Sequence, residues 1–206
     1  MELFELLRRR PRKIRFTFPN GVRVDGFDAE TLVAMEDAGC HLIALGIESG
    51  SDETLARMNK QQTRAKIEEA VRLVRARTRM KVTGFFILGY PGEGLAEIEE
   101  TIRFAVKLPI HHAHFCLFTP LPGTPVYDEL VEQGKINRDH YCFSDLTVDR
   151  PSIPPAGVKP GEMIRLHQWA YVRFYSRPWR ILSLLGQIRS LGHLRLILRR
   201  MIKLFR

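Results

Sequence analysis

Short apolar runs alternate with amphipathic segments along most of the chain. Apolar runs occur at residues 14–18, 41–47, 81–88 and 113–118, and their length and their β-branched and aromatic residues are typical of buried strands. The run at 81–88 lacks Asn, Asp and Pro, so it predicts the central strand of a parallel sheet. Its interior Gly84 indicates that another backbone or a ligand comes close.

The segments between these runs have helical periodicity. Apolar residues of 63–77 form one stripe, and Asp28 is a suitable N-cap for a helix that ends at Gly39. Further helices are expected at residues 1–10, 52–58, 97–107 and 126–133. The repeated order of strand and helix predicts an α/β fold with right-handed crossovers. Four such units complete neither a doubly wound sheet nor a barrel, so they leave two open sheet edges, and a C-terminal helical extension follows them.

Charge divides the chain into regions. Lys and Arg number 32 against 23 Asp and Glu, yet no acidic residue follows Glu162, so the excess of +9 belongs to the tail. We expect a barrel portion at residues 1–140, a proline-rich linker at 141–160 and a basic helical extension at 161–206. Residues 194–206 form a basic amphipathic helix, which suits an anionic membrane surface, packing over the body or nucleic acid. Nucleic acid is the least expected partner, because aromatic interleaving is absent.

The cysteines exclude a disulfide framework. Cys40, Cys116 and Cys142 lie far apart without CxxC spacing, which indicates buried thiols in a reducing cytoplasm, with Cys116 in the core. We also expect the histidines at 111, 112 and 114 to be solvated or hydrogen-bonded rather than metal ligands. The sequence contains no signal peptide and no run of about 20 apolar residues. A cytoplasmic location follows, with any membrane contact peripheral.

Unusual groups follow three of the predicted strands: residues 20–23, Glu48 with Ser49, and residues 89–93. The carboxyl ends of parallel strands share one edge of a sheet, where such folds carry their chemistry. A carboxylate directly after an apolar strand is costly to bury unpaired, so Glu48 should meet a hydroxyl or a cation.

Three motifs carry a resemblance to a known family. GIESGS at 46–51, FFILGYPGE at 85–93 and FTPLPGTPVYDEL at 118–130 resemble successive strand regions of radical S-adenosylmethionine (SAM) enzymes. The combination is similar to the branch that often carries an upstream cobalamin-binding domain, as in the anaerobic magnesium-protoporphyrin ester cyclase type. The likeness covers about residues 14–176.

The resemblance implies a partial TIM-like barrel, of which this chain would form the C-terminal portion of about four βα units. In that barrel a four-iron four-sulfur cluster cleaves SAM to start a radical reaction. By this likeness Glu48 and Ser49 contact the ribose or methionine end of SAM, and Ile87 and Gly89 flank its adenine. The segment beginning at Phe118 offers backbone contacts, and Arg23 is a candidate for the methionine carboxylate. This residue assignment includes no catalytic residue and no metal ligand.

The sequence departs from the family where the cluster is bound. Such clusters need thiolates, which the family supplies from a CxxxCxxC motif, and no such motif is present. We therefore interpret the chain as the C-terminal part of a radical SAM oxidoreductase, cyclase or methyltransferase, inactive without an upstream half. The alternative is a cluster-free interaction protein that binds another chain, or a second copy, through open sheet edges and the basic tail.

Overall fold

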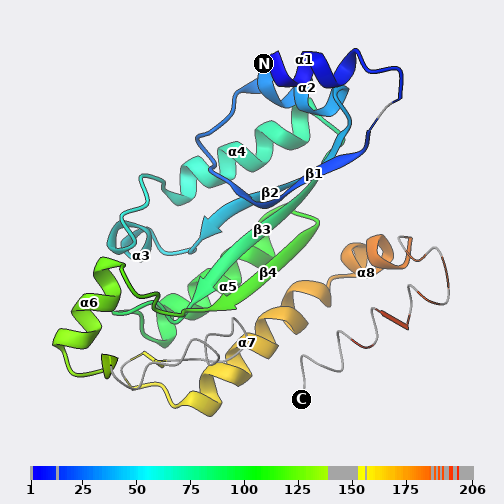
Figure 1. Ribbon diagram of the computed structural model, residues 1–206. Coiled ribbons are helices and arrows are strands. Elements are labelled where there is room, and N and C mark those ends of the chain that lie inside the picture. Colours follow the sequence, from blue (N-terminus) through cyan, green and yellow to red (C-terminus); the bar gives the residue numbers. More distant parts are fainter. Residues whose placement is uncertain are drawn as a thin grey trace.

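The computed structural model describes residues 2–12, 14–138, 153–155 and 157–186, with a few single residues between 188 and 199. Four strands and eight helices are defined in these residues (Figure 1). In chain order they are α1 Glu2–Arg8, β1 Phe16–Val22, α2 Ala29–Asp37, β2 Cys40–Glu48, α3 Asp52–Arg57, α4 Arg64–Arg77, β3 Lys81–Leu88, α5 Leu95–Lys107, β4 His112–Leu117, α6 Pro125–Glu132, α7 Pro160–Tyr175 and α8 Pro178–Leu185.

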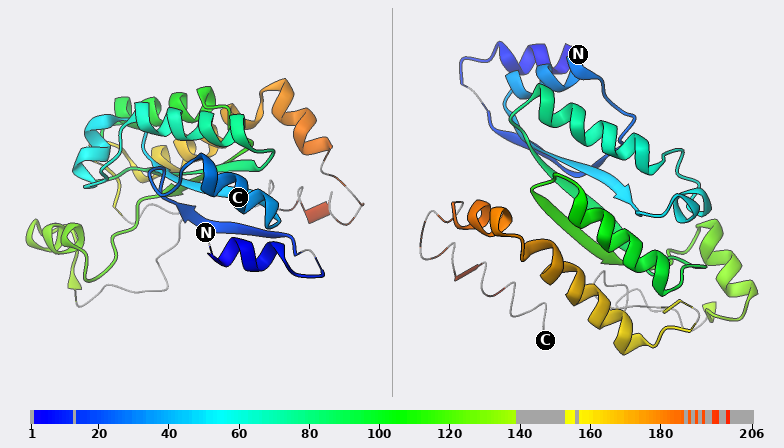
Figure 2. Two further views of the ribbon diagram at one scale, coloured as in Figure 1. Left: turned by 90° about the horizontal axis from the view of Figure 1, so that it is seen from above. Right: turned by 180° about the vertical axis from the view of Figure 1, so that it is seen from behind.

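The strands form one parallel sheet in the order β1-β2-β3-β4. Seen from behind, α4 and α5 lie across one face of this sheet (Figure 2). Sequential order with helical crossovers on one face is the repeated parallel unit that the sequence predicts. The predicted α/β class is confirmed. The carboxyl ends of the strands, which carry the unusual residues, lie together at one end of the sheet.

The core lies between the sheet and its helices. Alternate residues of β3 are buried on the helix side, whereas Phe85 and Ile87 on the other side are only partly covered. A side chain at Gly84 would lie 2.8 Å from Ile47 Cδ1 and 2.9 Å from Ile110 Cδ1. The expected close approach at Gly84 is therefore made by core side chains.

Strand β1 continues through a sequence that we predicted would end it. Pro19, Asn20 and Gly21 lie within the strand, and the register with β2 shifts between Phe18 and Val22. An edge strand tolerates a proline because one side of its backbone needs no ladder partner, and Gly21 adopts a φ of 81° at the irregularity. The strand therefore brings residues 20–22 to the end of the sheet at which the other strands have their carboxyl ends.

Helix α7 covers the free edge of β4. The Tyr171 hydroxyl lies 3.1 Å from the amide nitrogen of Phe115 and 3.3 Å from its carbonyl oxygen. The Tyr175 hydroxyl bridges the same two groups of Ala113, at 3.4 Å each. His167 Nε2 lies 2.8 Å from the Phe115 carbonyl oxygen. The prediction of two open edges is wrong at β4, because these side chains occupy the positions that a further strand would use.

Arg180 joins α8 to the body. This residue is 1% exposed. Its guanidinium donates to the carbonyls of Val106 and Leu108 at the end of α5 and of Phe174 near the end of α7. Carbonyls at helix C-termini carry partial negative charge, so they suit a buried cation. Burial lowers the pKa of Arg180 to about 10.

The predicted linker at 141–160 and the predicted amphipathic helix at 194–206 lie largely outside the described residues, which include few positions beyond residue 186 and none in 139–152. Helices α7 and α8 occupy the first part of the predicted helical extension at 161–206. No helix in the described part of the chain has both the length and the apolar character needed to cross a bilayer.

Candidate functional site

Strand β2 ends in a bulge that presents Glu48. Gly46 lies opposite Phe85, but Glu48 lies opposite Phe86, so two residues of β2 face one residue of β3. Glu48 has a φ of 66°, in the left-handed region that costs a non-glycine residue about 1–2 kcal/mol. Its Oε1 accepts a hydrogen bond of 2.9 Å from Lys60 Nζ. The expected cation partner of Glu48 is therefore present.

The loop after α3 supplies both Lys60 and a second polar group. The amide of Asn59 donates to the Ala56 carbonyl and that of Lys60 to the Leu55 carbonyl, which together form a Schellman motif with Asn59 at a φ of 52°. The motif turns the chain back toward the end of β2. There Gln62 Nε2 donates to the carbonyls of Gly46 and Ile47, at 3.2 and 3.0 Å.

A cavity of about 420 Å³ opens at this edge of the sheet. It is lined by residues 20–23 at the carboxyl end of β1, Gly46 and Glu48 of β2, residues 60–62, residues 85–87 of β3 and Cys116 of β4. One wall thus carries a carboxylate and an ammonium group, and another is apolar. This volume and mixture are typical of a small-molecule site.

Cys116 lines this cavity, so the prediction that it belongs to the core is wrong. The strand alternation places Phe115 and Leu117 toward the helices, and Cys116 faces the opposite side with Ile87, its register partner. Cys116 Sγ lies 3.3 Å from His114 Nδ1. The error arises because an apolar run in a parallel sheet does not reveal which of its two faces remains open.

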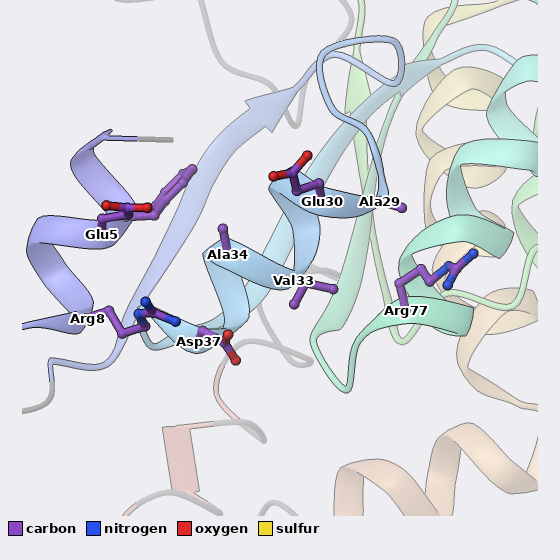
Figure 3. A pocket seen from close by; sticks show the side chains of 9 residues that line it. Glu5, Arg8, Ala29, Glu30, Val33, Ala34, Asp37 and Arg77 are labelled. Atoms are coloured by element: carbon purple, nitrogen blue, oxygen red, sulfur yellow. The ribbon is translucent and has the colours of Figure 1, made fainter.

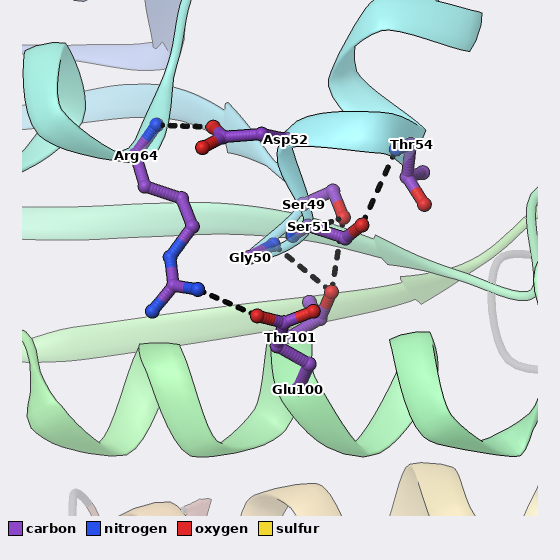
Figure 4. Close-up of polar contacts among 8 residues, drawn as sticks. All are labelled: Ser49, Gly50, Ser51, Asp52, Thr54, Arg64, Glu100 and Thr101. Carbon is purple, nitrogen blue, oxygen red and sulfur yellow. Dashed lines mark hydrogen bonds and ion pairs between the residues drawn. The ribbon is translucent and has the colours of Figure 1, made fainter.

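Ser49 lies behind the cavity wall and is fully buried. Its hydroxyl lies 3.0 Å from the Thr101 hydroxyl of α5, which also accepts from the amide of Gly50 (Figure 4). The Ser49 hydroxyl accepts from the amide of Ser51, and Ser51 caps α3 through the amide of Thr54. This network fixes the turn after Glu48 onto α5, so Ser49 supports the site without lining the cavity.

The turn after β3 is organised by Glu93. Its Oε2 accepts from the amides of Gly89 and Tyr90, at 2.8 and 2.9 Å. Burial raises the pKa of Glu93 to about 7, while the hydrogen bonds from Tyr90 and Gly89 oppose this rise. Glu93 Oε1 has no hydrogen-bond partner within the described part of the chain, nor has the nearby Arg57 Nε. Gly89 itself adopts a φ of 81°.

The remaining predicted contacts divide between the cavity and the core. Ile87 and Arg23 line the cavity, although Arg23 is exposed and forms a two-bond ion pair with Asp25. Gly89 and Phe118 do not line it: a side chain at Gly89 would meet Met163 of α7, and Phe118 packs edge-on against Tyr90. Three of the six predicted residues thus converge, namely Arg23, Glu48 and Ile87, and the sequence prediction missed Lys60 and Gln62 as their neighbours.

A second hollow, of about 400 Å³, lies between α1, α2 and the end of α4 (Figure 3). Glu5, Glu30 and Asp37 face it together with Arg8 and Arg77. It lies among the helices, away from the carboxyl ends of the strands, where parallel folds carry their chemistry. We therefore place the functional site at the first cavity.

Comparison with known proteins identifies the family. The radical SAM superfamily profile matches residues 1–105, about half of the chain. The chain belongs to the radical SAM superfamily. An uncharacterized methyltransferase of Pyrococcus horikoshii is 33% identical over 159 residues, which are 76% of this chain and 33% of that protein. The anaerobic magnesium-protoporphyrin IX monomethyl ester cyclase of Cereibacter sphaeroides is 30% identical over 176 residues, 82% of this chain and 28% of that protein.

The predicted membership of the radical SAM superfamily and the predicted likeness to the cyclase are confirmed, and the chain spans about a third of the length of these relatives. Solved radical SAM structures share the fold. The methyltransferase TsrM of Kitasatospora setae, with cobalamin and a [4Fe-4S] cluster bound, has a TM-score of 0.56 at 23% identity over 64% of this chain and 25% of that chain. Coproporphyrinogen III oxidase of Escherichia coli has a TM-score of 0.58 at 15% identity, and the match covers 85% of this chain and 36% of that chain.

The two described thiols of this radical SAM chain do not fit an iron–sulfur cluster. Cys40 is buried at the start of β2 and donates to the Leu42 carbonyl, whereas Cys116 lies near the end of β4, at the opposite end of a parallel sheet. Cys142 lies outside the described residues. The described residues contain no group of three or more His, Cys, Asp and Glu that could hold a metal ion. A three-thiolate ligand set is therefore not formed by the described cysteines.

Two of the three histidines are hydrogen-bonded or largely buried. His111 Nδ1 accepts a 3.1 Å hydrogen bond from the amide of Val82. Burial, together with the smaller effects of the neighbouring Lys81 and His111, lowers the pKa of His112 to about 4. Both residues lie at the amino end of β4, away from the cavity edge.

Proposed function

We propose that this chain supplies the SAM-binding wall of a radical SAM enzyme. The observation that carries the proposal is the cavity at the carboxyl edge of the sheet, which brings Glu48, Lys60 and Ile87 together from separate elements. SAM is a cofactor with a flat apolar base, a diol and a charged amino acid end. Each of these parts has a chemically matched partner on this wall.

The residue roles follow from their chemistry. Ile87 and Phe85 form the apolar surface against which adenine packs, and the Glu48 carboxylate accepts hydrogen bonds from the ribose hydroxyls. Lys60 pairs with the methionine carboxylate while it remains beside Glu48. Arg23 is the weaker candidate for that role, because Asp25 already engages its guanidinium through two bonds. Ser49, Gly89 and Phe118 shape the wall from behind.

The cluster and the reaction require groups that the described residues do not supply. When bound in a radical SAM enzyme, a four-iron four-sulfur cluster supplies the electron for reductive cleavage of SAM. We assign no step of that cleavage to this chain, and we propose that thiolates from another segment or another chain hold the cluster. The overall reaction belongs to the oxidoreductase, cyclase or methyl-transfer classes, and cobalamin is a candidate cofactor of the complete enzyme.

Equilibrium dialysis with radiolabelled SAM, on the iron-free chain, tests the proposed wall. We expect saturable binding that Glu48→Gln and Lys60→Met each weaken about tenfold, because hydrogen bonds to charged groups contribute about 1.5–3 kcal/mol. Glu69→Gln and Lys107→Met remove charges from helix surfaces outside the cavity and should leave the affinity unchanged. Binding that is absent, or that is insensitive to both cavity variants, would overturn the proposal.

The competing proposal is a cluster-free interaction protein. It gains support from β1, whose outer edge is the end of the sheet, and it loses support from β4, whose edge α7 covers. The dialysis experiment separates the two functions. A cluster-free interaction protein has no need to bind SAM, so its chain should show no SAM affinity that depends on Glu48.

A further inference from the structure

Strand alternation gives the Glu48 side chain its face, and the bulge sets its position on that face. Leu45 and Ile47 of β2 are fully buried, so Gly46 and Glu48 share the face that lines the cavity. Ile47 and Glu48 both stand opposite Phe86, and Glu48 has a left-handed backbone with a φ of 66°. The point at which the carboxylate meets the cavity therefore depends on the shape of the bulge.

A bulge of this kind needs support. The extra residue interrupts the backbone ladder, and buried carbonyls without partners cost about 1–3 kcal/mol each. The carbonyls of Gly46 and Ile47 lie at this interruption, and both accept from Gln62 Nε2. The amide of Ser49 also donates to the Ile47 carbonyl, at 2.9 Å, and closes a tight turn around Glu48. The Gln62 amide thus links the two peptide groups that immediately precede Glu48, and it is the side chain that joins them.

Gln62 is itself held in place from both sides. The Schellman motif that ends α3 precedes it, and Thr63 follows it as the N-cap of α4. Gln62 is only 9% exposed, whereas the neighbouring Gln61 is exposed. A buried amide between two fixed helix ends is well suited to hold a backbone shape.

We propose that Gln62 is a positioning residue, which acts through the bulge to point the Glu48 carboxylate into the cavity. This inference rests on the proposed SAM-binding function. Gln62→Met keeps the length of the side chain and removes both donors. The variant relaxes the bulge and turns Glu48 away, so it should weaken SAM binding about tenfold, as Glu48→Gln does.

A double-mutant cycle separates positioning from a general structural effect. In the Glu48→Gln background, Gln62→Met should lower the SAM affinity further by less than about twofold, because the carboxylate that Gln62 directs is already gone. Gln62→Asn, whose amide is one methylene too short to reach both carbonyls, should behave like Gln62→Met and serves if the latter does not fold. Gln133→Met, at an exposed helix end, is the matched control and should bind SAM as the wild type does.

A cycle on thermal unfolding provides a measurement without SAM. Glu48→Gln should lower the melting temperature less in the Gln62→Met background than in the wild type, because the ion pair with Lys60 is already lost. Full additivity in either cycle, or unchanged SAM affinity in Gln62→Met, would overturn the inference. A wild-type chain that binds no SAM would instead remove the proposed function, and the unfolding cycle alone would then decide the role of Gln62.

Discussion

Single polar residues determine the shape of both strand ends at the site. Glu48 is paired with Lys60, and Glu93 accepts from the two amides that begin the turn after β3. The two carboxylates differ in their surroundings, because Glu93 is 2% exposed and has no cation bonded to its carboxylate within the described residues. Glu93 is thus the residue whose protonation should be visible in stability.

The free energy of unfolding should fall as pH rises from about 4.5 to about 7. Burial raises the pKa of Glu93 in the folded state from an ordinary 4.5 to about 7, so folding favours its protonated form. The stabilisation is complete below the unfolded value and is lost as pH passes the folded value, a change of about 3 kcal/mol. Glu93→Gln keeps an acceptor for both amides and cannot ionise.

Urea unfolding of the wild type and Glu93→Gln across pH 4 to 8 checks this expectation. The variant should gain stability relative to the wild type as pH rises, whereas the exposed Glu69→Gln should not. Parallel pH profiles for wild type and Glu93→Gln would show that Glu93 is ionised in the folded state at acidic pH.

At the scale of elements, close packing fixes the positions of the strand ends. The turn after β2 rests directly on α5, and a side chain at Gly50 would lie 2.6 Å from Phe104 Cβ and 2.8 Å from Thr101 Cα. One of these atoms belongs to the backbone of a core helix, so the clash has no easy relief. The position of Glu48 is therefore coupled to the seating of α5.

Gly50→Ala should destabilise the chain by about 1–3 kcal/mol, because an extra methyl group must be placed in a filled core. Gly161→Ala, in the first turn of α7 where nothing lies within 4 Å, is the matched control and should be neutral or slightly stabilising. Chemical denaturation of both variants makes the comparison, and equal stability of the two would contradict the packing argument.

Removing the cover of β4 should promote self-association. Tyr171→Phe with Tyr175→Phe deletes the hydroxyls that occupy the outward peptide groups of Ala113 and Phe115, and exposed parallel edges pair with other chains. Light scattering coupled to size exclusion should show a higher average mass than for the wild type at equal concentration. Tyr90→Phe is the control, and an unchanged mass for the double variant would count against the edge-covering role.

At the scale of the whole molecule, the fold was predictable because periodicity and turn residues agree along the chain. The boundaries of β3 match the predicted run at 81–88. Asp28 and Thr63 are the N-caps of α2 and α4, and both are residue types that favour this position. The site was only partly predictable. Glu48 can be found in the sequence because it is a carboxylate directly after an apolar strand. Lys60 and Gln62 are brought to the end of β2 by the Schellman motif after α3, and the sequence marks that motif only weakly, by Asn59.

The open face of the sheet was also beyond sequence reasoning. Cys116 was assigned to the core because burial on one face and exposure to a cavity on the other produce the same apolar run. The covering of β4 by α7 depends on contacts between residues more than fifty positions apart, which no local pattern reveals.

We propose that this chain provides the SAM-binding wall and depends on thiolates from another segment or another chain for the cluster. Anaerobic reconstitution of the purified chain with iron and sulfide, followed by assay of 5′-deoxyadenosine formed from SAM under reduction, tests this dependence. Because Cys40 and Cys116 lie at opposite ends of the sheet, we expect neither stoichiometric iron nor 5′-deoxyadenosine. A bound four-iron cluster that cleaves SAM would contradict the claim.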